Sequence, residues 1–220
     1  MHGCNGTGGA ERIEARLRGW FPGRAFVKAA AIGDHPILPE EQALVVGAVP
    51  RRRHEFATGR WLSRQGLRHF GLPDRPVGMG RLRNPLWPDS IIGTISHDGA
   101  HCAVVLMERS GPVAGIGIDL IALAQRAGRM EELTPMFVAG PGELDAVAAL
   151  CDAVEPAMLL FSLKESVIKA LAHRLTDFID MRDIVFGWSD GLRVGVHGQD
   201  IGAAPFAATT GRYLVTAVTV

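Results

Sequence analysis

The segment Phe161–Leu171 is the feature that most constrains how this 220-residue chain can fold. Its sequence, FSLKESVIKAL, places Lys164, Glu165 and Lys169 in a run that is otherwise mostly apolar. On a helix, Glu165 and Lys169 lie one turn apart on one face, and apolar residues cover most other sides, so burial is expected. A buried charge is costly unless it is paired or bound to an ion. The chain has three lysines among its 23 basic residues, so two of them beside one glutamate favour a site over the ordinary alternative, a solvated Glu–Lys pair.

Composition narrows the class of protein. The 23 basic and 23 acidic residues balance, which argues against a general polyanion binder, so we expect no nucleic-acid partner. The three cysteines are far apart and form no CxxC pair, so we expect neither a disulfide framework nor a zinc site. The first twenty residues lack the apolar core of a signal peptide, and charges interrupt the most apolar window, residues 154–171. We therefore expect a cytoplasmic protein with no membrane partner.

Helices and strands are segregated along the chain rather than alternating, which is typical of an α+β fold. The pair Gly111–Pro112 separates two similar halves, residues 1–112 and 113–220, and the Gly-rich residues 1–10 are expected to be disordered. Capping residues and apolar spacing predict helices over 39–47, 51–70, 142–150 and 156–175. Alternation and turn residues predict strands over 24–32, 91–96, 101–107, 113–121, 183–188, 192–197, 206–210 and 213–219.

A second carboxylate follows the apolar, Gly-punctuated sequence GIGID, residues 115–119. Asp119 is expected at the end of this strand, where it either starts a loop or binds a metal. Magnesium typically needs one or two protein carboxylates and keeps several waters or substrate phosphates. Asp119 and Glu165, from two different elements, are therefore a candidate Mg²⁺ pair, and Lys169 beside that ion would contact the same phosphates.

The first half contains the other groups expected at an anion site. Arg53 and Arg60 are seven residues apart, hence on one face of the predicted helix, and Arg81 lies in a loop rich in Gly and Pro. Ser96 and His97 end a predicted strand and can donate to phosphate oxygens. A solvated basic face and a structural histidine are the alternatives.

Together these pieces resemble the 4′-phosphopantetheinyl transferases of the surfactin- and enterobactin-synthetase-activating type. Four blocks carry the resemblance, and their order and spacing agree over roughly residues 45–190: RRHEFATGR (52–60), NPLWPDSIIGTISHDG (84–99), GIGIDL (115–120) and FSLKESVIKAL (161–171). The sequence TDFIDMRDIV (176–185) resembles the segment that follows the last block.

The resemblance implies a fold of two similar α+β halves related by pseudo-twofold symmetry, with coenzyme A in the cleft between them. It implies Mg²⁺-dependent transfer of phosphopantetheine from CoA to a serine of an apo carrier domain, releasing adenosine 3′,5′-bisphosphate. The carrier would belong to a non-ribosomal peptide, polyketide, siderophore or fatty-acid synthase, and we expect the transferase to be a monomer.

The resemblance also implies a role for each candidate residue. Asp119 and Glu165 would bind Mg²⁺, Glu165 would serve as the base, and Lys169 would contact the pyrophosphate. The remaining candidates would hold the nucleotide and phosphates of CoA, and they are Arg53, Arg60, Arg81, Ser96, His97 and Lys164.

One position departs from the family pattern. Members of this type commonly read Asp-x-Glu at the metal strand, whereas here Ile121 stands where the second acid would be. Two alternatives to an active transferase therefore remain: a catalytically weakened relative that binds CoA or a carrier, and an unrelated Mg²⁺-dependent phosphohydrolase acting on nucleotides.

Overall fold

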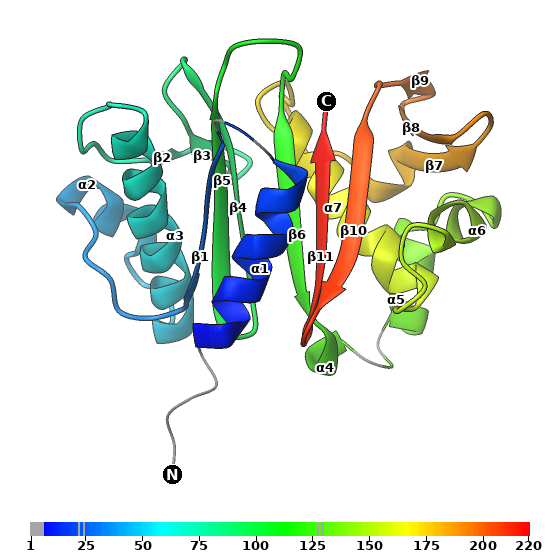
Figure 1. Cartoon of the computed structure of the whole chain (residues 1–220), viewed down its shortest axis with the longest axis horizontal. Helices are drawn as coiled ribbons and strands as arrows, with labels where there is room; N and C mark the ends of the chain where they lie inside the picture. Colours follow the sequence, from blue (N-terminus) through cyan, green and yellow to red (C-terminus); the bar gives the residue numbers. More distant parts are fainter. Residues whose placement is uncertain (1–6, 22, 24, 127, 129) are drawn as a thin grey trace. The chain divides into compact units, whose positions relative to one another are not determined.

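The chain divides into two units, Met1–Pro112 (unit 1) and Val113–Val220 (unit 2) (Figure 1). The computed structural model describes residues 7–21, 23, 25–126, 128 and 130–220. Each unit combines helices with antiparallel strands, so the chain is α+β.

Unit 1 is built around one antiparallel sheet with the strand order β1-β5-β4. Short strands β2 and β3 form a separate pair. Its elements are α1 (Thr7–Trp20), β1 (Phe26–Ala31), α2 (Pro39–Gln42), the 3₁₀ helix η1 (Ala43–Val45), α3 (Pro50–His69), β2 (Gly78–Met79), β3 (Pro85–Leu86), β4 (Ile91–Asp98) and β5 (His101–Glu108).

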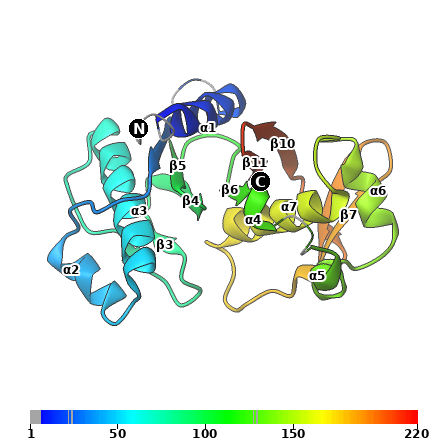
Figure 2. The ribbon, with the colours of Figure 1, turned by 90° about the horizontal axis from the view of Figure 1, so that it is seen from below.

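Helices α1 and α3 cover opposite faces of strand β5 (Figure 2). A Cβ atom added to Gly66 of α3 would collide with Leu106, and one added to Gly9 of α1 would collide with His101. Residues 101 and 106 point to opposite faces because side chains alternate along a strand. This explains why β5 is buried from His101 through Leu106.

The expected disorder of residues 1–10 is wrong for residues 7–10, which begin α1; residues 1–6 lie outside the described part. Ile13 and Leu17, one turn apart, are fully buried, and Arg18 pairs with Glu14 one turn before it. Arg18 also donates to the carbonyl oxygen of Val27 in β1. Tertiary packing therefore holds this helix despite its Gly-rich start.

Unit 2 contains two antiparallel sheets, with the strand orders β10-β11-β6 and β7-β8-β9. Its helices are α4 (Leu123–Arg126), α5 (Met130–Phe137), α6 (Gly142–Ala148), α7 (Pro156–Leu171) and the 3₁₀ helix η2 (Met181–Asp183). Its strands are β6 (Ile116–Ala122), β7 (Ile184–Trp188), β8 (Leu192–Val196), β9 (Gln199–Asp200), β10 (Ala204–Thr210) and β11 (Tyr213–Thr219).

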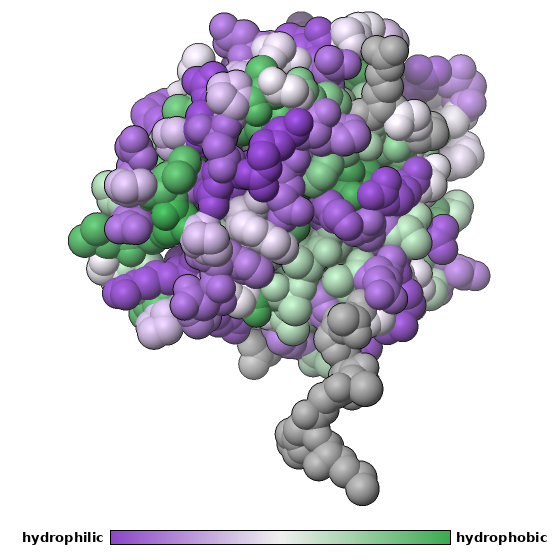
Figure 3. All heavy atoms as spheres, turned by 60° about the vertical axis from the view of Figure 1, so that its left-hand side comes forward, coloured by the Kyte–Doolittle hydropathy of each residue, from purple (hydrophilic) through white to green (hydrophobic). Residues whose placement is uncertain are grey.

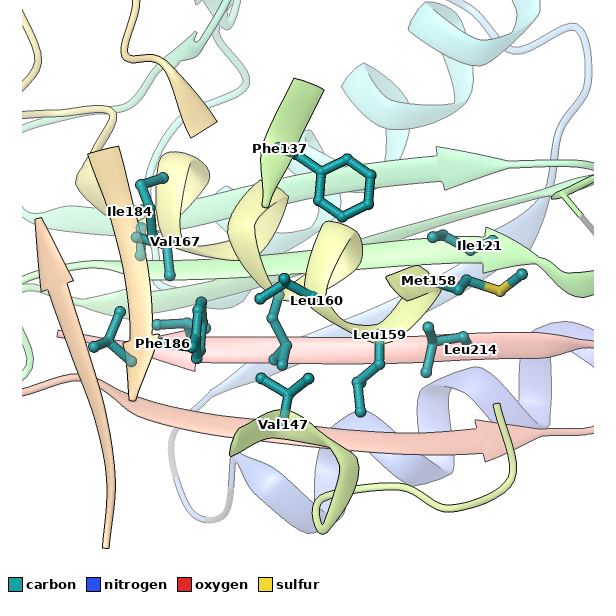
Figure 4. Close-up of a cluster of buried hydrophobic side chains, with 14 of the residues drawn as sticks. Ile121, Phe137, Val147, Met158, Leu159, Leu160, Val167, Ile184, Phe186 and Leu214 are labelled. Atoms are coloured by element: carbon teal, nitrogen blue, oxygen red, sulfur yellow. The ribbon is translucent and has the colours of Figure 1, made fainter. Parts of the chain in front are cut away.

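Helix α7 packs against β6 and β11 and is buried along most of its length. Figure 4 shows its side chains within the hydrophobic core of unit 2, together with residues of β6, β7, β11 and the preceding helices. The core includes Ile121, Phe137, Val147, Met158, Leu159, Leu160, Val167, Ile184, Phe186 and Leu214. The expected burial of the segment FSLKESVIKAL is therefore confirmed for most of its residues.

The same connectivity occurs in both units. In unit 1 the first strand, β1, pairs with β5, the second strand of the β4–β5 hairpin; in unit 2, β6 pairs with β11 of the β10–β11 hairpin. A long helix, α3 or α7, lies between the first strand and the hairpin in the sequence and packs on that first pair of strands. Both hairpins turn through a glycine with positive φ, Gly99 (59°) and Gly211 (61°).

Hydrophilic side chains predominate on the face shown in Figure 3, with hydrophobic patches between them. In unit 1, Val46 and Val49 are the most exposed large hydrophobic residues of the described part, at 83% and 66%. No helix among the described residues is both long and apolar enough to cross a membrane.

Candidate functional site

Asp119 lies within strand β6 and not at its end, because pairing with β11 continues to Ala122. Its cross-strand partner is Thr216 of β11. Apolar neighbours keep the strand fully buried, and Asp119 itself is 7% exposed. The expectation that Asp119 ends the strand is therefore wrong, and its carboxylate projects from the middle of a sheet.

Two glycines bring α7 against this strand. Gly115 and Gly117 share a face with Asp119, since side chains alternate along β6. A Cβ atom added to Gly117 would overlap the carbonyl oxygen of Ser166, and one added to Gly115 would overlap that of Ala170. Only glycine permits this approach of helix to strand, which places Asp119 within reach of the polar side chains of α7.

Lys169 of α7 makes an ion pair with Asp119. Its Nζ lies 2.7 Å from Asp119 Oδ1 and also donates to the carbonyl oxygen of Ile118 at 3.0 Å. The other carboxylate oxygen, Oδ2, accepts a hydrogen bond of 2.9 Å from Ser162 Oγ. Two side chains of α7, a helix far from β6 in the sequence, thus hold both oxygens of Asp119.

Glu165, one turn before Lys169 on α7, is half-buried near the same groups. Burial raises the pKa of its carboxyl group, and Lys169 opposes that rise. The Asp119 carboxylate raises the pKa of Glu165 further, while Arg126 of α4 lowers it. Two carboxylates therefore interact across α7 and β6, and Arg126 is a nearby cation that the sequence motifs did not indicate.

These two carboxylates fit Mg²⁺ by their chemistry. They are hard oxygen donors, and burial disfavours the charge on Glu165 in the absence of a cation. The described residues contain no group of three or more His, Cys, Asp or Glu side chains suited to a metal, so the protein would supply two acids. Ile121, where the family pattern has an acid, is 1% exposed in the core.

Lys164 does not lie where a phosphate ligand is expected. It is fully buried, and its Nζ lies 2.8 Å from Glu143 Oε1 and donates to the carbonyl oxygen of Phe137 at 2.7 Å. Glu143 also accepts from the backbone N–H groups of Ala139 and Phe186. Burial lowers the pKa of Lys164, although Glu143 opposes this. The prediction that Lys164 contacts CoA phosphate is therefore corrected: this lysine joins α7 to the end of α5 and to α6 and, through Glu143, to β7.

In unit 1, the structure brings Arg52 to His97, a pair that the sequence analysis missed. Arg52 Nη1 lies 2.8 Å from His97 Nε2 and 3.3 Å from Glu55 Oε2. His97 Nδ1 lies 3.6 Å from the same Glu55 oxygen. Arg53 was predicted because it lies seven residues from Arg60 on one helix face. In the structure, however, Arg53 is exposed and Arg60 is buried.

The other candidates of unit 1 lie in different environments. Arg53 donates from Nε to the carbonyl oxygen of Ala48 and lines a pocket of about 540 Å³. Arg60 is 5% exposed, and its guanidinium lies over the ring of Phe56. Its Nη2 donates to the carbonyl oxygen of Gly78, whereas its Nε has no hydrogen-bond partner among the described residues. Burial lowers the pKa of Arg60 to about 10.

The last two predicted phosphate-binding residues of unit 1 are Ser96 and Arg81. Ser96 is 2% exposed and points to the opposite face of β4 from His97, because neighbouring strand residues alternate. Arg81 is exposed in the turn between β2 and β3.

Comparison with family models matches both units. The model of the 4′-phosphopantetheinyl transferase N-terminal domain matches residues 40–107, and the model of the 4′-phosphopantetheinyl transferase superfamily matches residues 115–218.

Several characterised relatives are similar over much of the chain. The 4′-phosphopantetheinyl transferase Svp of Streptomyces mobaraensis is 40% identical over 72% of this chain and 64% of its own length. The 4′-phosphopantetheinyl transferase PptT of Mycobacterium tuberculosis is 30% identical over 81% of each chain. Enterobactin synthase component D of Salmonella typhimurium is 33% identical over 67% of this chain and 61% of its own length. The matched part therefore spans less than two thirds of two of these relatives.

Among solved structures, the holo-[acyl-carrier-protein] synthase of Thermotoga maritima matches 49% of this chain and 63% of its own, with 24% identity and a TM-score of 0.36. That likeness is too low to carry an argument about the site. The two family models and PptT are sufficient by themselves: the chain belongs to the 4′-phosphopantetheinyl transferase superfamily.

Proposed function

We propose that this protein transfers the 4′-phosphopantetheine moiety of coenzyme A to a serine of an apo carrier domain. A bond forms between the serine oxygen and the β-phosphorus of CoA, and the pyrophosphate bond to that phosphorus breaks. Adenosine 3′,5′-bisphosphate leaves. Membership of the superfamily supports this activity, and the observation that carries it is the meeting of Asp119, Glu165 and Lys169 at the α7–β6 contact.

Asp119 and Glu165 would hold Mg²⁺, which when bound neutralises charge on the pyrophosphate oxygens. Lys169 is an ammonium donor beside Asp119, and in the reaction it would donate to a pyrophosphate oxygen and favour charge build-up there. Glu165 would accept the proton of the carrier serine.

The basic groups of unit 1 would hold the phosphates and nucleotide of CoA. The Arg60 guanidinium is buried, and its Nε has no hydrogen-bond partner within the described part of the chain, an arrangement that an anionic ligand would relieve. Arg52 donates from Nη1 to His97 Nε2, and we add Arg52 to this set beside Arg53, Arg81, Ser96 and His97.

The repeated connectivity supports a chain of two similar α+β halves. The protein would act as a monomer on a carrier domain of a siderophore, peptide, polyketide or fatty-acid synthase. Enterobactin synthase component D among the relatives supports a siderophore carrier as the first to test.

The proposal is tested by mass spectrometry of an apo carrier protein after incubation with the protein, CoA and Mg²⁺. We expect the carrier to gain one phosphopantetheine, and to gain none when Glu165→Ala replaces the wild type. An unchanged carrier mass with retained CoA binding would instead favour the weakened binding relative. Release of inorganic phosphate without any carrier would favour a phosphohydrolase.

A further inference from the structure

Three buried hydroxyl groups form a hydrogen-bonded cluster that reaches the Asp119 carboxylate. Ser162 and Ser166 are one turn apart on α7, and Thr216 is the cross-strand partner of Asp119 on β11. All three residues are 0% exposed. Thr216 Oγ1 lies 2.8 Å from Ser162 Oγ and 2.8 Å from Ser166 Oγ, so it joins the two helix serines.

The direction of the hydrogen bonds follows from counting protons. Each hydroxyl group carries one hydrogen, and a carboxylate oxygen only accepts. Ser162 donates its hydrogen to Asp119 Oδ2, so Ser162 Oγ can only accept from Thr216. Thr216 carries one hydrogen, and the acceptors within its reach are Ser162 Oγ, the Ser162 carbonyl oxygen at 3.1 Å and Ser166 Oγ. Either Thr216 or Ser166 can be the donor in the contact between their hydroxyl groups.

The result is a buried hydrogen-bonded network in which Ser162 donates to Asp119 and Thr216 joins Ser162 to Ser166. Hydrogen bonds in such a network polarise one another in a low-dielectric interior. The network fixes Oδ2 of Asp119, while Oδ1 faces Lys169 at 2.7 Å. Contacts at both oxygens thus set the rotation of the carboxylate.

We propose that Ser162, backed by Thr216 and Ser166, is a positioning residue that orients Asp119 for the divalent ion and for Lys169. This inference rests on the proposed function, because it assigns a task within the proposed metal site. Hydrogen-bonded partners of this kind orient metal-ligating carboxylates, and their loss typically lowers metal affinity or activity by about 10–100-fold.

The test uses the full chain and Mn²⁺ as a spectroscopic probe, with free Mn²⁺ followed by electron paramagnetic resonance in the presence of CoA. CoA without protein supplies the background. The variants are Ser162→Ala, Ser162→Cys, Thr216→Val and, as a matched control, Ser63→Ala. Ser63 is also a fully buried helix serine, but its hydroxyl donates to the carbonyl oxygen of Gly59 in unit 1.

We expect Ser162→Ala to raise the half-saturating Mn²⁺ concentration by about tenfold and to lower kcat, with the KM for CoA nearly unchanged. Ser162→Cys, which retains a weak donor of similar size, should recover part of the loss. Thr216→Val should produce a smaller rise, since it removes a more distant link. Ser63→Ala should leave Mn²⁺ uptake at the wild-type value even where it lowers stability.

Two outcomes would overturn the inference, and they separate it from the proposed function. If the wild type takes up Mn²⁺ and Ser162→Ala takes it up equally well, the positioning role is wrong and the metal site stands. If the wild type takes up no Mn²⁺ beyond the CoA background, the metal site and this inference both fall.

Discussion

Glu165 combines a half-buried carboxylate with charged neighbours of both signs, which is the arrangement expected of a group kept for function at a cost in stability. Its raised pKa means that the folded chain binds a proton more readily than the unfolded chain does. The ionised carboxylate therefore disfavours the metal-free fold at pH values above its folded pKa. That effect disappears as the pH falls below the ordinary carboxyl value.

We predict that Glu165→Gln lowers kcat for carrier modification by about 10²–10⁴-fold, because an amide cannot accept the serine proton. Without metal, the same variant should unfold at a higher temperature than the wild type at pH 7.5, and the difference should shrink toward pH 4. Glu155→Gln, at an exposed position before α7, is the control and should change neither quantity. A Glu165→Gln variant that is active and less stable would contradict both roles of Glu165.

Lys164 gives the second prediction at the level of single residues. Lys164→Ala should lower the free energy of unfolding by about 3–5 kcal/mol, because it leaves the buried Glu143 carboxylate without its partner. Lys28→Ala, at a lysine whose side chain is 43% exposed, is the matched control and should cost less than about 1 kcal/mol.

CoA affinity distinguishes this structural role from a phosphate contact. Lys164→Met, which fills the same space without charge, should bind CoA as the wild type does under conditions where both are folded. Weaker CoA binding in a variant of wild-type stability would restore Lys164 to the substrate site.

At the scale of elements, the contact between α7 and β6 determines whether the site forms. We predict that Gly117→Ala costs about 1–3 kcal/mol of stability and lowers transferase activity, because the added methyl must push α7 away from Asp119. Gly187→Ala in β7 is the control, since an added Cβ there meets no atom within 4 Å. Equal activity of Gly117→Ala and the wild type would show that the close approach is not needed.

Much of the secondary structure could be predicted from the sequence, because Pro, Gly and apolar spacing mark the ends of the long helices and of the hairpins. The helix predicted over 51–70 is α3, and the strand predicted over 213–219 is β11. Helix α1 was missed because its Gly-rich first turn hides the spacing of Ile13 and Leu17. The predicted strand end at Asp119 was wrong because a buried polar residue can lie within a strand when helix side chains satisfy it.

The site could be predicted only in part. Charges in an apolar helix indicated Glu165, and helical spacing placed Lys169 on its face. The spacing could not show that Lys164 pairs with Glu143, because Glu143 lies on a different helix. Arg52 was missed for a related reason. Helical spacing relates residues of one helix to each other, whereas the position of His97 depends on how β4 packs against α3.

At the scale of the whole molecule, the two units share one connectivity, but their long helices carry different functional groups. In unit 1 the long helix α3 carries Arg52 and Arg60, and in unit 2 the long helix α7 carries Glu165 and Lys169. We propose that unit 1 supplies cationic groups and that unit 2 binds the metal, a division that suits a substrate carrying several phosphates.

A crystal structure of the protein with CoA and Mg²⁺ tests the central claim most directly. We predict one ion bound by carboxylate oxygens of both Asp119 and Glu165 at about 2.0–2.1 Å, with the CoA pyrophosphate as a further ligand. Lys169 Nζ should then contact a pyrophosphate oxygen. An ion bound by only one of these acids, or CoA bound away from the α7–β6 contact, would contradict the account.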